Sequence, residues 1–245
     1  EYIHNTEQFQ FHNTVVALGK FDGMHKGHQL IFDELIQYKQ LGYQAAVFSF
    51  DRPPLNMLKH KHMRVIYTTN EKIKLLARRG IDIYIEHPFT DEFSHLSPED
   101  FVIKVLLEKT GMKVLVVGDD CGFGYKRQGN VELLERMSKE YDFKLIVIPK
   151  LELEGEIVSS TRIRHLLSEG KVEEANRLME DPFMICGSVV HGNHMGAEVL
   201  QMPTANQIPL EDKLLPPNGV YVSRIHYKDE TYYGCLLYTS DAADE

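Results

Sequence analysis

Two histidines three residues apart follow the first apolar run of the chain. The run TVVALG (14–19) reads as a buried strand and continues into GKFDGMHKGH (19–28), where an amphipathic helix begins. His25 and His28 share one face of that helix start, whose unpaired N–H groups attract anions. The pattern predicts a phosphate site. A zinc pair would need further ligands at a suitable spacing, and surface histidines are the simpler alternative. The glycines that let the backbone approach a ligand closely are Gly19, Gly23 and Gly27.

Carboxylates and glycines follow a second strand-like run. KVLVVG (113–118) leads into GDDCGFGYKRQG (118–129). A carboxylate such as Asp120 at the end of a buried strand can orient a polar ligand or a metal-bound water. A turn whose Asp caps the next helix is the alternative.

Hydroxyls and arginines stand together at a third helix start, VSSTRIR (158–164). Hydroxyls there normally cap the helix, but two arginines in its first turns oppose the helix dipole. A nearby polyphosphate would remove that conflict. Arg162 and Arg164 are two residues apart and cannot point in the same direction, so we predict Arg164 at the phosphates and Arg162 at the solvated surface.

Strand-like runs that alternate with helical patterns up to about residue 180 must position these motifs. Such alternation predicts a parallel sheet covered by helices on both faces, with ligands beyond the carboxyl ends of the strands. The predicted strands are 14–19, 43–50, 81–87, 113–118 and 143–149. The predicted helices are 26–42, 70–80, 97–111, 131–140 and a helix from the third motif to residue 170.

The amino-acid pattern changes after residue 182. Short runs rich in Val and Tyr follow, separated by Gly, Pro and Asn. This composition is typical of antiparallel strands. We therefore predict one domain over 1–182 and the beginning of another over 183–234.

Charge and hydropathy restrict the class of protein. The net charge of −9 argues against a broad nucleic-acid interface, which needs clustered cations. No apolar run approaches the roughly 18 residues of a membrane helix, and the first residues lack the apolar core of a signal peptide. Three widely spaced cysteines fit a reducing compartment, so we expect a cytoplasmic protein without a membrane or nucleic-acid partner. Nothing in the sequence indicates an oligomeric state.

The first motif resembles the signature of the nucleotidylyltransferase superfamily, and its GxFDGxHxGH form is similar to that of bacterial bifunctional riboflavin kinase/FAD synthetases. The third motif is similar to the family's ISSTxIR. The resemblance implies a Rossmann-like parallel-sheet domain that transfers AMP from ATP to FMN, giving FAD and pyrophosphate, with Mg²⁺ bridging phosphates. It implies catalytic roles for His25, His28 and Arg164. It implies ATP contacts from Gly19, Phe21, Asp22, Gly27, Asp120, Ser159, Ser160 and Thr161.

Two loops carry the implied flavin contacts. GDDCGFGYKRQG resembles the family's GxDFxFGxxRxG, with Cys121 in place of a Phe. SFDRPP (49–54) matches the family's TFxPHP only in part, since Arg52 and Pro53 replace the Pro-His pair. The FMN-binding residues implied by the resemblance are Pro54, Phe123 and Arg127.

The C-terminal part resembles the start of a riboflavin kinase barrel, through GSVVHG (187–192), PTAN (203–206) and LPPNGVY (215–221). The resemblance implies that Thr204 and Asn206 bind a Mg-nucleotide. The family continues with more of an antiparallel barrel and a catalytic glutamate. We therefore expect an incomplete barrel without riboflavin kinase activity. We interpret 235–245 as a non-native tail, since LYTSDAADE looks like a translated sequencing adapter; resequencing the source DNA tests this.

Two other functions remain open. Another HxGH nucleotidylyltransferase, acting on pantetheine phosphate or glycerol phosphate, fits the first motif but lacks the PTAN and GVY blocks. A flavin- or nucleotide-binding module without turnover fits the departures at Cys121 and Pro53. Release of pyrophosphate from ATP and FMN distinguishes an enzyme from a module.

Overall fold

A six-stranded parallel sheet forms the N-terminal part of the chain, as the alternating pattern predicts. The computed structural model describes residues 1–51, 64–190, 205–228 and 230–238. The strand order is β1-β4-β3-β2-β5-β6, and every neighbouring pair is parallel. The strands are β1 (Tyr2–His4), β2 (Thr14–Leu18), β3 (Gln44–Phe50), β4 (Ile83–His87), β5 (Met112–Gly118) and β6 (Lys144–Ile148).

Helices cover both faces of this sheet because its central strands are mostly apolar and buried on both sides. Successive residues of β2 point to opposite sides: Val15 and Ala17 enter one core, and Val16 and Leu18 enter the other. The helices on the first face are α1 (Lys26–Gln40), α3 (Thr69–Arg78), α7 (Ser160–Ser168) and α8 (Val172–Leu178). On the second face lie α5 (Pro98–Asp100), the helix η1 (Phe101–Lys109) and α6 (Val131–Glu140).

The helix predicted over 97–111 differs from an ordinary α-helix. Ser97 caps it and Pro98 opens it, as the sequence indicates, but from Phe101 it continues with the wider π-helical turn. The Thr110 amide donates to the Val105 carbonyl five residues back. The Thr110 hydroxyl donates to the Leu106 carbonyl at 2.5 Å, so its polar groups are satisfied although the residue is fully buried.

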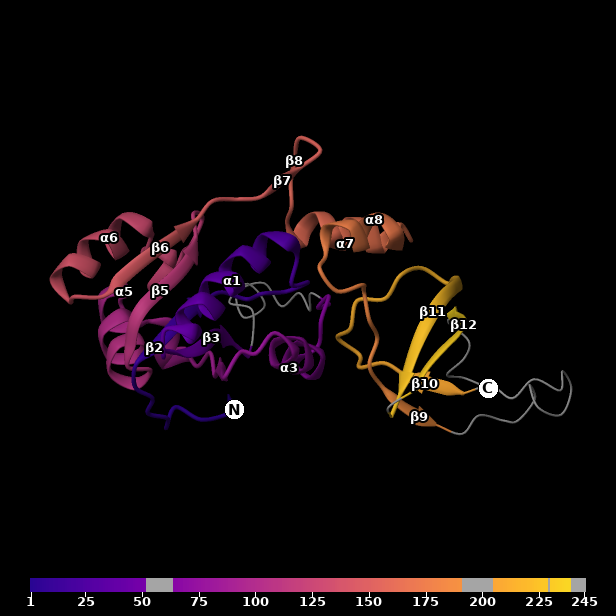
Figure 1. Ribbon diagram of the computed structural model, residues 1–245, viewed down its shortest axis with the longest axis horizontal. Coiled ribbons are helices and arrows are strands. Elements are labelled where there is room, and N and C mark those ends of the chain that lie inside the picture. The colour runs from indigo at the N-terminus through magenta and orange to yellow at the C-terminus, as the bar shows by residue number, and fades with distance from the viewer. Residues whose placement is uncertain (52–63, 191–204, 229, 239–245) are drawn as a thin grey trace, which may run out of the picture.

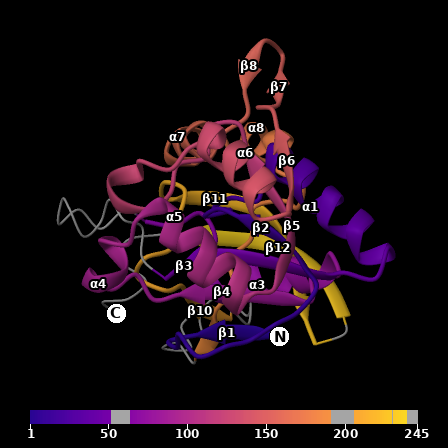
Figure 2. The same ribbon diagram turned by 90° about the vertical axis from the view of Figure 1, so that its left-hand side faces the viewer.

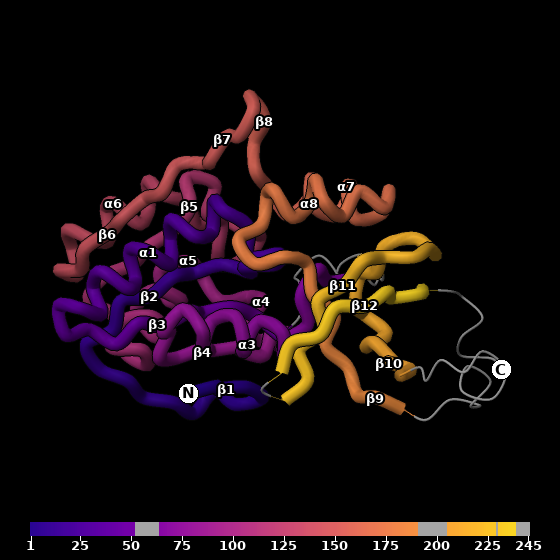
Figure 3. Tube along the Cα trace, turned by 45° about the vertical axis from the view of Figure 1, so that its right-hand side comes forward, coloured from indigo at the N-terminus to yellow at the C-terminus, as the bar shows by residue number. Residues whose placement is uncertain are grey.

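Several short elements carry too few residues for a periodic signal. β1 adds a parallel edge to β4 (Figure 3), where the Tyr2 hydroxyl donates to Glu86 at 2.7 Å. The hairpin of β7 (Glu152–Leu153) and β8 (Glu156–Ile157) projects from the body just before α7 (Figure 2). The other short elements are α4 (Asp91–Ser94) and η2 (Tyr125–Arg127).

Short antiparallel pairs follow the sheet domain, on the right of Figure 1. β9 (Ser188–Val190) pairs with β10 (Asn206–Ile208), and β11 (Gly219–Tyr227) pairs with β12 (Glu230–Tyr238). The β11–β12 ribbon exposes apolar side chains, including Val222 at 92%. β12 runs through Gly234 to Tyr238, and the predicted boundaries at residues 182 and 234 stay predictions. No helix within the described ranges is both long and apolar enough to cross a bilayer.

Candidate active site

Asp22 joins the first and third motifs at the carboxyl edge of the sheet. It lies in the loop between β2 and α1, and its backbone carbonyl accepts a 2.6 Å hydrogen bond from the Ser160 hydroxyl at the start of α7. Its carboxylate Oδ2 forms an ion pair with the guanidinium of Arg164. Both side chains are largely buried, which strengthens the interaction. Two motifs that are far apart in the sequence therefore form one site.

The second carboxylate oxygen of Asp22 is also occupied. Oδ1 accepts the backbone N–H groups of Ile66 and Tyr67 at 3.0 and 3.1 Å. Sequence reasoning assigned Asp22 to ATP, but its side chain is engaged within the protein. It holds the loop after β2, the turn at 66–67 and α7 in one arrangement.

The two histidines stack on each other at the start of α1. Their ring centroids are 3.6 Å apart, and the Phe21 and His28 rings pack edge to face, with centroids 5.1 Å apart. His25 is the N-cap residue, and its Nδ1 accepts the His28 backbone N–H at 3.3 Å. A neutral His25 with Nδ1 as acceptor carries its proton on Nε2, so Nε2 is the donor available to a ligand.

Burial keeps both imidazoles neutral. Desolvation lowers the pKa of His25 to about 4, although the Asp120 carboxylate partly opposes it. Desolvation, followed by the influence of His25, lowers the pKa of His28 well below its usual range. The Nδ1 atom of His28 is buried and has no hydrogen-bond partner in the described part of the chain. A buried polar atom of this kind is available to a bound group.

Two glycines of the first motif leave room for these rings. A Cβ on Gly19 would lie 2.9 Å from the Phe21 ring, and one on Gly27 would lie 3.2 Å from Nδ1 of His25. Both positions therefore favour glycine for a packing reason. Phe21 itself is 3% exposed and has a positive φ of 49°, so the loop is held in a strained conformation.

Three cations interact at the carboxyl edge of the sheet, namely Lys20, Arg127 and Arg164, and sequence reasoning missed Lys20. Desolvation, with the like charges of Arg127 and Arg164, lowers the pKa of Lys20, although the residue as a whole is exposed. The Asp22 carboxylate opposes this shift. Such a group of cations attracts a polyanion. The only sequence signal for Lys20 is its place directly after β2 and Gly19.

The loop after β5 contributes unequally to the site. Asp120 is 69% exposed at its side chain and pairs with Lys150 at 3.1 Å, near enough to affect His25. Phe123 is only 5% exposed and packs 5.8 Å from Phe101, so its ring supports the loop from within. Arg127 lies over Gly122, where a Cβ would come within 2.8 Å of the guanidinium.

The hydroxyls and the second arginine of the third motif have separate positions. Ser159 caps α7 by accepting the Arg162 amide at 3.3 Å, and Thr161 is exposed. The Arg162 guanidinium pairs with Glu156 of β8 at 2.7 Å, and its side chain is only 27% exposed, so the prediction of a solvated Arg162 is wrong because this ion pair holds it against the hairpin. The separation of Arg162 from Arg164 agrees with their two-residue spacing.

An aromatic cluster at the carboxyl ends of β3 and β4 is a further feature that sequence reasoning missed. Phe50 packs 5.4 Å from Phe89 and 5.6 Å from Phe93, and the His87 ring lies 4.4 Å from Phe93. Closely spaced aromatics in HPFTDEF (87–93) were the available signal. Pro54 follows Phe50 closely in the sequence, but it lies outside the described residues, as do Arg52, Pro53 and Thr204. Asn206 lies in β10 opposite Val190 and is exposed.

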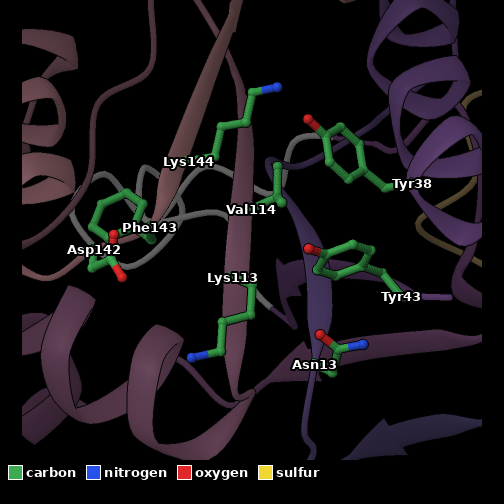
Figure 4. A pocket seen from close by; sticks show the side chains of 8 residues that line it. All are labelled: Asn13, Tyr38, Tyr43, Lys113, Val114, Asp142, Phe143 and Lys144. Carbon is green, nitrogen blue, oxygen red and sulfur yellow. The ribbon is translucent and has the colours of Figure 1, made fainter. Parts of the chain in front are cut away.

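A hollow of about 540 Å³ lies at the amino ends of the strands, opposite the edge that carries the predicted site, and Figure 4 shows its lining. Lys144 points toward Tyr38, with its ammonium 5.3 Å from that ring, whereas Lys113 points away from Tyr43. The hollow contains none of the predicted site residues. Within the described ranges, no three His, Cys, Asp or Glu side chains gather in a way that could hold a metal ion.

A parallel sheet with a stacked histidine pair at its carboxyl edge defines a nucleotidylyltransferase-like α/β protein. Comparison with known proteins narrows the class. The FAD synthetase family model matches residues 7–162, and the riboflavin kinase model matches residues 179–240. The chain belongs to the bifunctional riboflavin kinase/FMN adenylyltransferase family.

Relatives of this family resemble the chain along most of its length. The Buchnera aphidicola (Schizaphis graminum) bifunctional riboflavin kinase/FMN adenylyltransferase is 38% identical over 91% of this chain and 72% of its own. The Listeria monocytogenes and Escherichia coli K12 proteins of that description are 35% and 32% identical, over 75% and 71% of their lengths. A Streptococcus pneumoniae crystal structure described as a macrolide-efflux protein superimposes with a TM-score of 0.84 at 29% identity, over 99% of this chain and 81% of that one.

Proposed function

We propose that the chain is an FMN adenylyltransferase, which transfers AMP from ATP to FMN and releases pyrophosphate. The observation that carries the proposal is the ion pair between Asp22 and Arg164. It brings the hydroxyl-capped start of α7 to the stacked histidines at the start of α1. Two helix N-termini and three cations then surround one place at the carboxyl edge of the sheet, as a nucleoside triphosphate requires.

The histidines act on the α-phosphate in this proposal. A phosphate oxygen of FMN attacks the α-phosphorus of ATP in line, the bond from that phosphorus to the bridging oxygen breaks, and pyrophosphate leaves. No protein nucleophile is needed, because such transfers depend on positioning and charge stabilisation. Nε2–H of His25, the ring of His28 and the first N–H groups of α1 stabilise the charge that develops on the α-phosphate.

The third motif holds the leaving group. Arg164, kept in position by Asp22, contacts the β- and γ-phosphates together with the exposed hydroxyl of Thr161. Ser159 and Ser160 fix the helix start and present its amides. The backbone at Gly19, Phe21 and Gly27 passes beside the nucleotide, and Asp120 orients its polar groups or bound water. In this proposal the residues that the resemblance assigns to ATP keep that role, and the Asp22 side chain acts through Arg164.

FMN binds next to the nucleotide, near Pro54, Phe123 and Arg127. Arg127 contacts the FMN phosphate, because it already lies among the cations. The half-buried rings of Phe50, Phe89 and Phe93 offer an apolar surface to the flavin ring system. Phe123 supports this surface from the core.

Mg²⁺ arrives with the nucleotide in this proposal. We infer that phosphate oxygens and water hold most of its coordination positions. When bound, Mg²⁺ neutralises phosphate charge. The protein side chains supply orientation through Arg164 and His25.

We do not expect riboflavin phosphorylation from the part of the chain that follows the sheet domain. β11 and β12 pair only with each other among the described strands and leave Val222 and Tyr233 exposed. Thr204 and Asn206 stay the proposed Mg-nucleotide residues of that reaction.

One assay tests these proposals together. The purified chain is incubated with ATP, Mg²⁺ and either FMN or riboflavin, and flavin products are separated by chromatography. FAD and pyrophosphate from FMN are the expected products. Binding of ATP and FMN without release of pyrophosphate would show that the chain is a binding module and not an enzyme. FMN formed from riboflavin would contradict the kinase expectation alone.

A further inference from the structure

A buried lysine of the second part lies in the sheet domain. Lys213 is 1% exposed, and its Nζ donates to the Ile66 carbonyl, a Glu71 carboxylate oxygen and the Met184 carbonyl, each at 2.6 Å. An ammonium group has three N–H donors, and all three are used. A cation buried with every donor satisfied is an ordered connection between parts of the chain.

The surroundings of Lys213 are equally complete. Its ammonium lies 5.1 Å from the Tyr67 ring and 4.5 Å from the Phe183 ring. Glu71, fully buried, accepts the Thr68 amide at 2.8 Å and the Cys186 amide at 2.7 Å. Burial lowers the pKa of Lys213, while Glu71 and, more weakly, Asp22 oppose the shift.

Backbone pairing fixes the same contact. The Val65 amide donates to the Asp212 carbonyl, and the Leu214 amide donates to the Val65 carbonyl, both at 2.7 Å. Residues 212–214 thus run alongside the turn at 65–67. The backbone on both sides of Lys213 is therefore hydrogen-bonded to Val65, while the Lys213 side chain binds the next carbonyl along, that of Ile66.

A single peptide unit connects Lys213 to the nucleotide site. The Ile66 carbonyl accepts Lys213, and the N–H of the same unit, which belongs to Tyr67, donates to Asp22 at 3.1 Å. Asp22 in turn holds Arg164. The hydrogen bonds therefore run without a gap from Lys213 through one peptide group and one carboxylate to the guanidinium.

We propose that Lys213 is a positioning residue of the adenylyltransferase site: it fixes the 65–67 turn, whose amides orient Asp22 and thereby Arg164. The second part of the chain then completes a site that lies in the first part. The inference rests on the proposed function only for its catalytic consequence. The structural link itself is testable without turnover.

Three variants of the full chain test the link. Lys213→Met removes the ammonium. The double variant Glu71→Gln/Lys213→Met also removes the negative charge of Glu71, which Lys213→Met alone would leave buried without its partner. The Gln side chain can still accept the hydrogen bond from the Thr68 amide. Lys39→Met is the control, because Lys39 forms a 2.5 Å ion pair with Asp82 at the opposite edge of the sheet.

Hydrogen exchange is the first measurement. In both Lys213 variants the backbone amides of 64–72 should exchange about tenfold faster than in the wild type. The amides in the first turns of α7 should also exchange about tenfold faster, because α7 is held to the 65–67 turn through Asp22. Lys39→Met should leave both segments as in the wild type. Unchanged exchange in α7 when 64–72 loosens would overturn the proposal, as would equal loosening of α7 in the control.

ATP binding and turnover give the second measurement. We expect an approximately tenfold weaker ATP dissociation constant and lower kcat in both Lys213 variants, with the FMN KM within about twofold of the wild type. ATP affinity equal to that of the wild type would contradict a positioning role. A wild-type chain that binds ATP but forms no FAD would sink the proposed function, while the exchange and affinity comparisons would still decide on Lys213.

Discussion

Asp22 and Arg164 stand 142 positions apart in the sequence, and their side chains form an ion pair at the carboxyl edge of the sheet. The pair explains why an arginine is stable in the first turns of α7. A cation there opposes the helix dipole, and the carboxylate offsets that repulsion. It also leaves a guanidinium beside Lys20 and Arg127 with a fixed direction.

The variant Asp22→Asn should separate the orientation of the Arg164 guanidinium from the net charge of the site. The amide keeps an acceptor for the Ile66 and Tyr67 amides but no longer pairs with Arg164. We expect kcat to fall by about 10- to 100-fold because the guanidinium is no longer held. The ATP KM should rise by less than the roughly tenfold weakening expected for the Lys213 variants, because the site also gains one net positive charge, which attracts ATP and partly offsets the freed guanidinium.

Steady-state kinetics with ATP and FMN varied separately check this expectation. Asp33→Asn is the matched control, because Asp33 is an exposed carboxylate on α1 that lies 3.9 Å from Arg79. A kcat for Asp22→Asn equal to that of this control would show that the ion pair has no role in turnover.

His28→Ala should abolish FAD formation, while stabilisation of the protein by ATP falls only modestly. The His28 ring stacks on His25, and its buried Nδ1 has no hydrogen-bond partner among the described residues, so it is ready to contact a phosphate. Removing one donor that acts on developing charge costs about 10²–10³ in rate. The contacts of ATP with Arg164 and the helix amides remain.

Product chromatography and thermal unfolding with ATP measure the two effects. His165→Ala is the control, because that side chain is 69% exposed on α7 and pairs with Glu169. An unchanged rate in His28→Ala would sink the assignment of His28.

The buried His25 should make the folded state sensitive to acid. Its pKa is about 4 in the folded protein and 6.5 in an unfolded chain, so between these values only the unfolded state binds the proton. Stability contributed by neutral His25 is complete above pH 6.5 and is lost as the pH falls towards 4. The loss from about pH 7.5 to about pH 5 is about 2 kcal/mol.

Urea unfolding at those two pH values, compared with His25→Asn, measures this contribution. Asn can still cap α1 and accept the His28 amide but does not titrate. The variant should lose about 2 kcal/mol less than the wild type on acidification. Equal losses in the two proteins would mean that His25 titrates in the folded state as it does in the unfolded one.

Local patterns predicted much of this site, because their information lies within a few residues. The spacing of His25 and His28 and the strand before them placed both rings at a helix start, and the two-residue offset separated Arg162 from Arg164. The same reasoning predicted the parallel sheet, since its buried strands are continuous apolar runs.

Long-range pairings could not be predicted in this way. No periodicity indicates that Asp22 meets Arg164, or that Lys213 is buried against Glu71, because both depend on how loops from different strands meet. Lys20 is a single lysine without a spacing signal. Asp22 was assigned to the ligand because its type suits a ligand, whereas its contacts lie within the protein.

Gly27→Ala should lower activity without lowering stability. Gly27 lies in the first turn of α1, where alanine is favoured over glycine by up to about 1 kcal/mol. The added Cβ would lie 3.2 Å from Nδ1 of His25 and 3.3 Å from the neighbouring ring carbon. The ring must therefore move by a few tenths of an ångström, which costs part of the helix gain. We expect a stability within about 1 kcal/mol of the wild type and a rate reduced by about tenfold or more, because small displacements of a catalytic group are costly. Gln37→Ala, on an exposed position of the same helix, is the control for an alanine that does not touch the His25 ring. Full activity in Gly27→Ala, measured beside urea unfolding of both variants, would show that the His25 ring need not occupy its observed position.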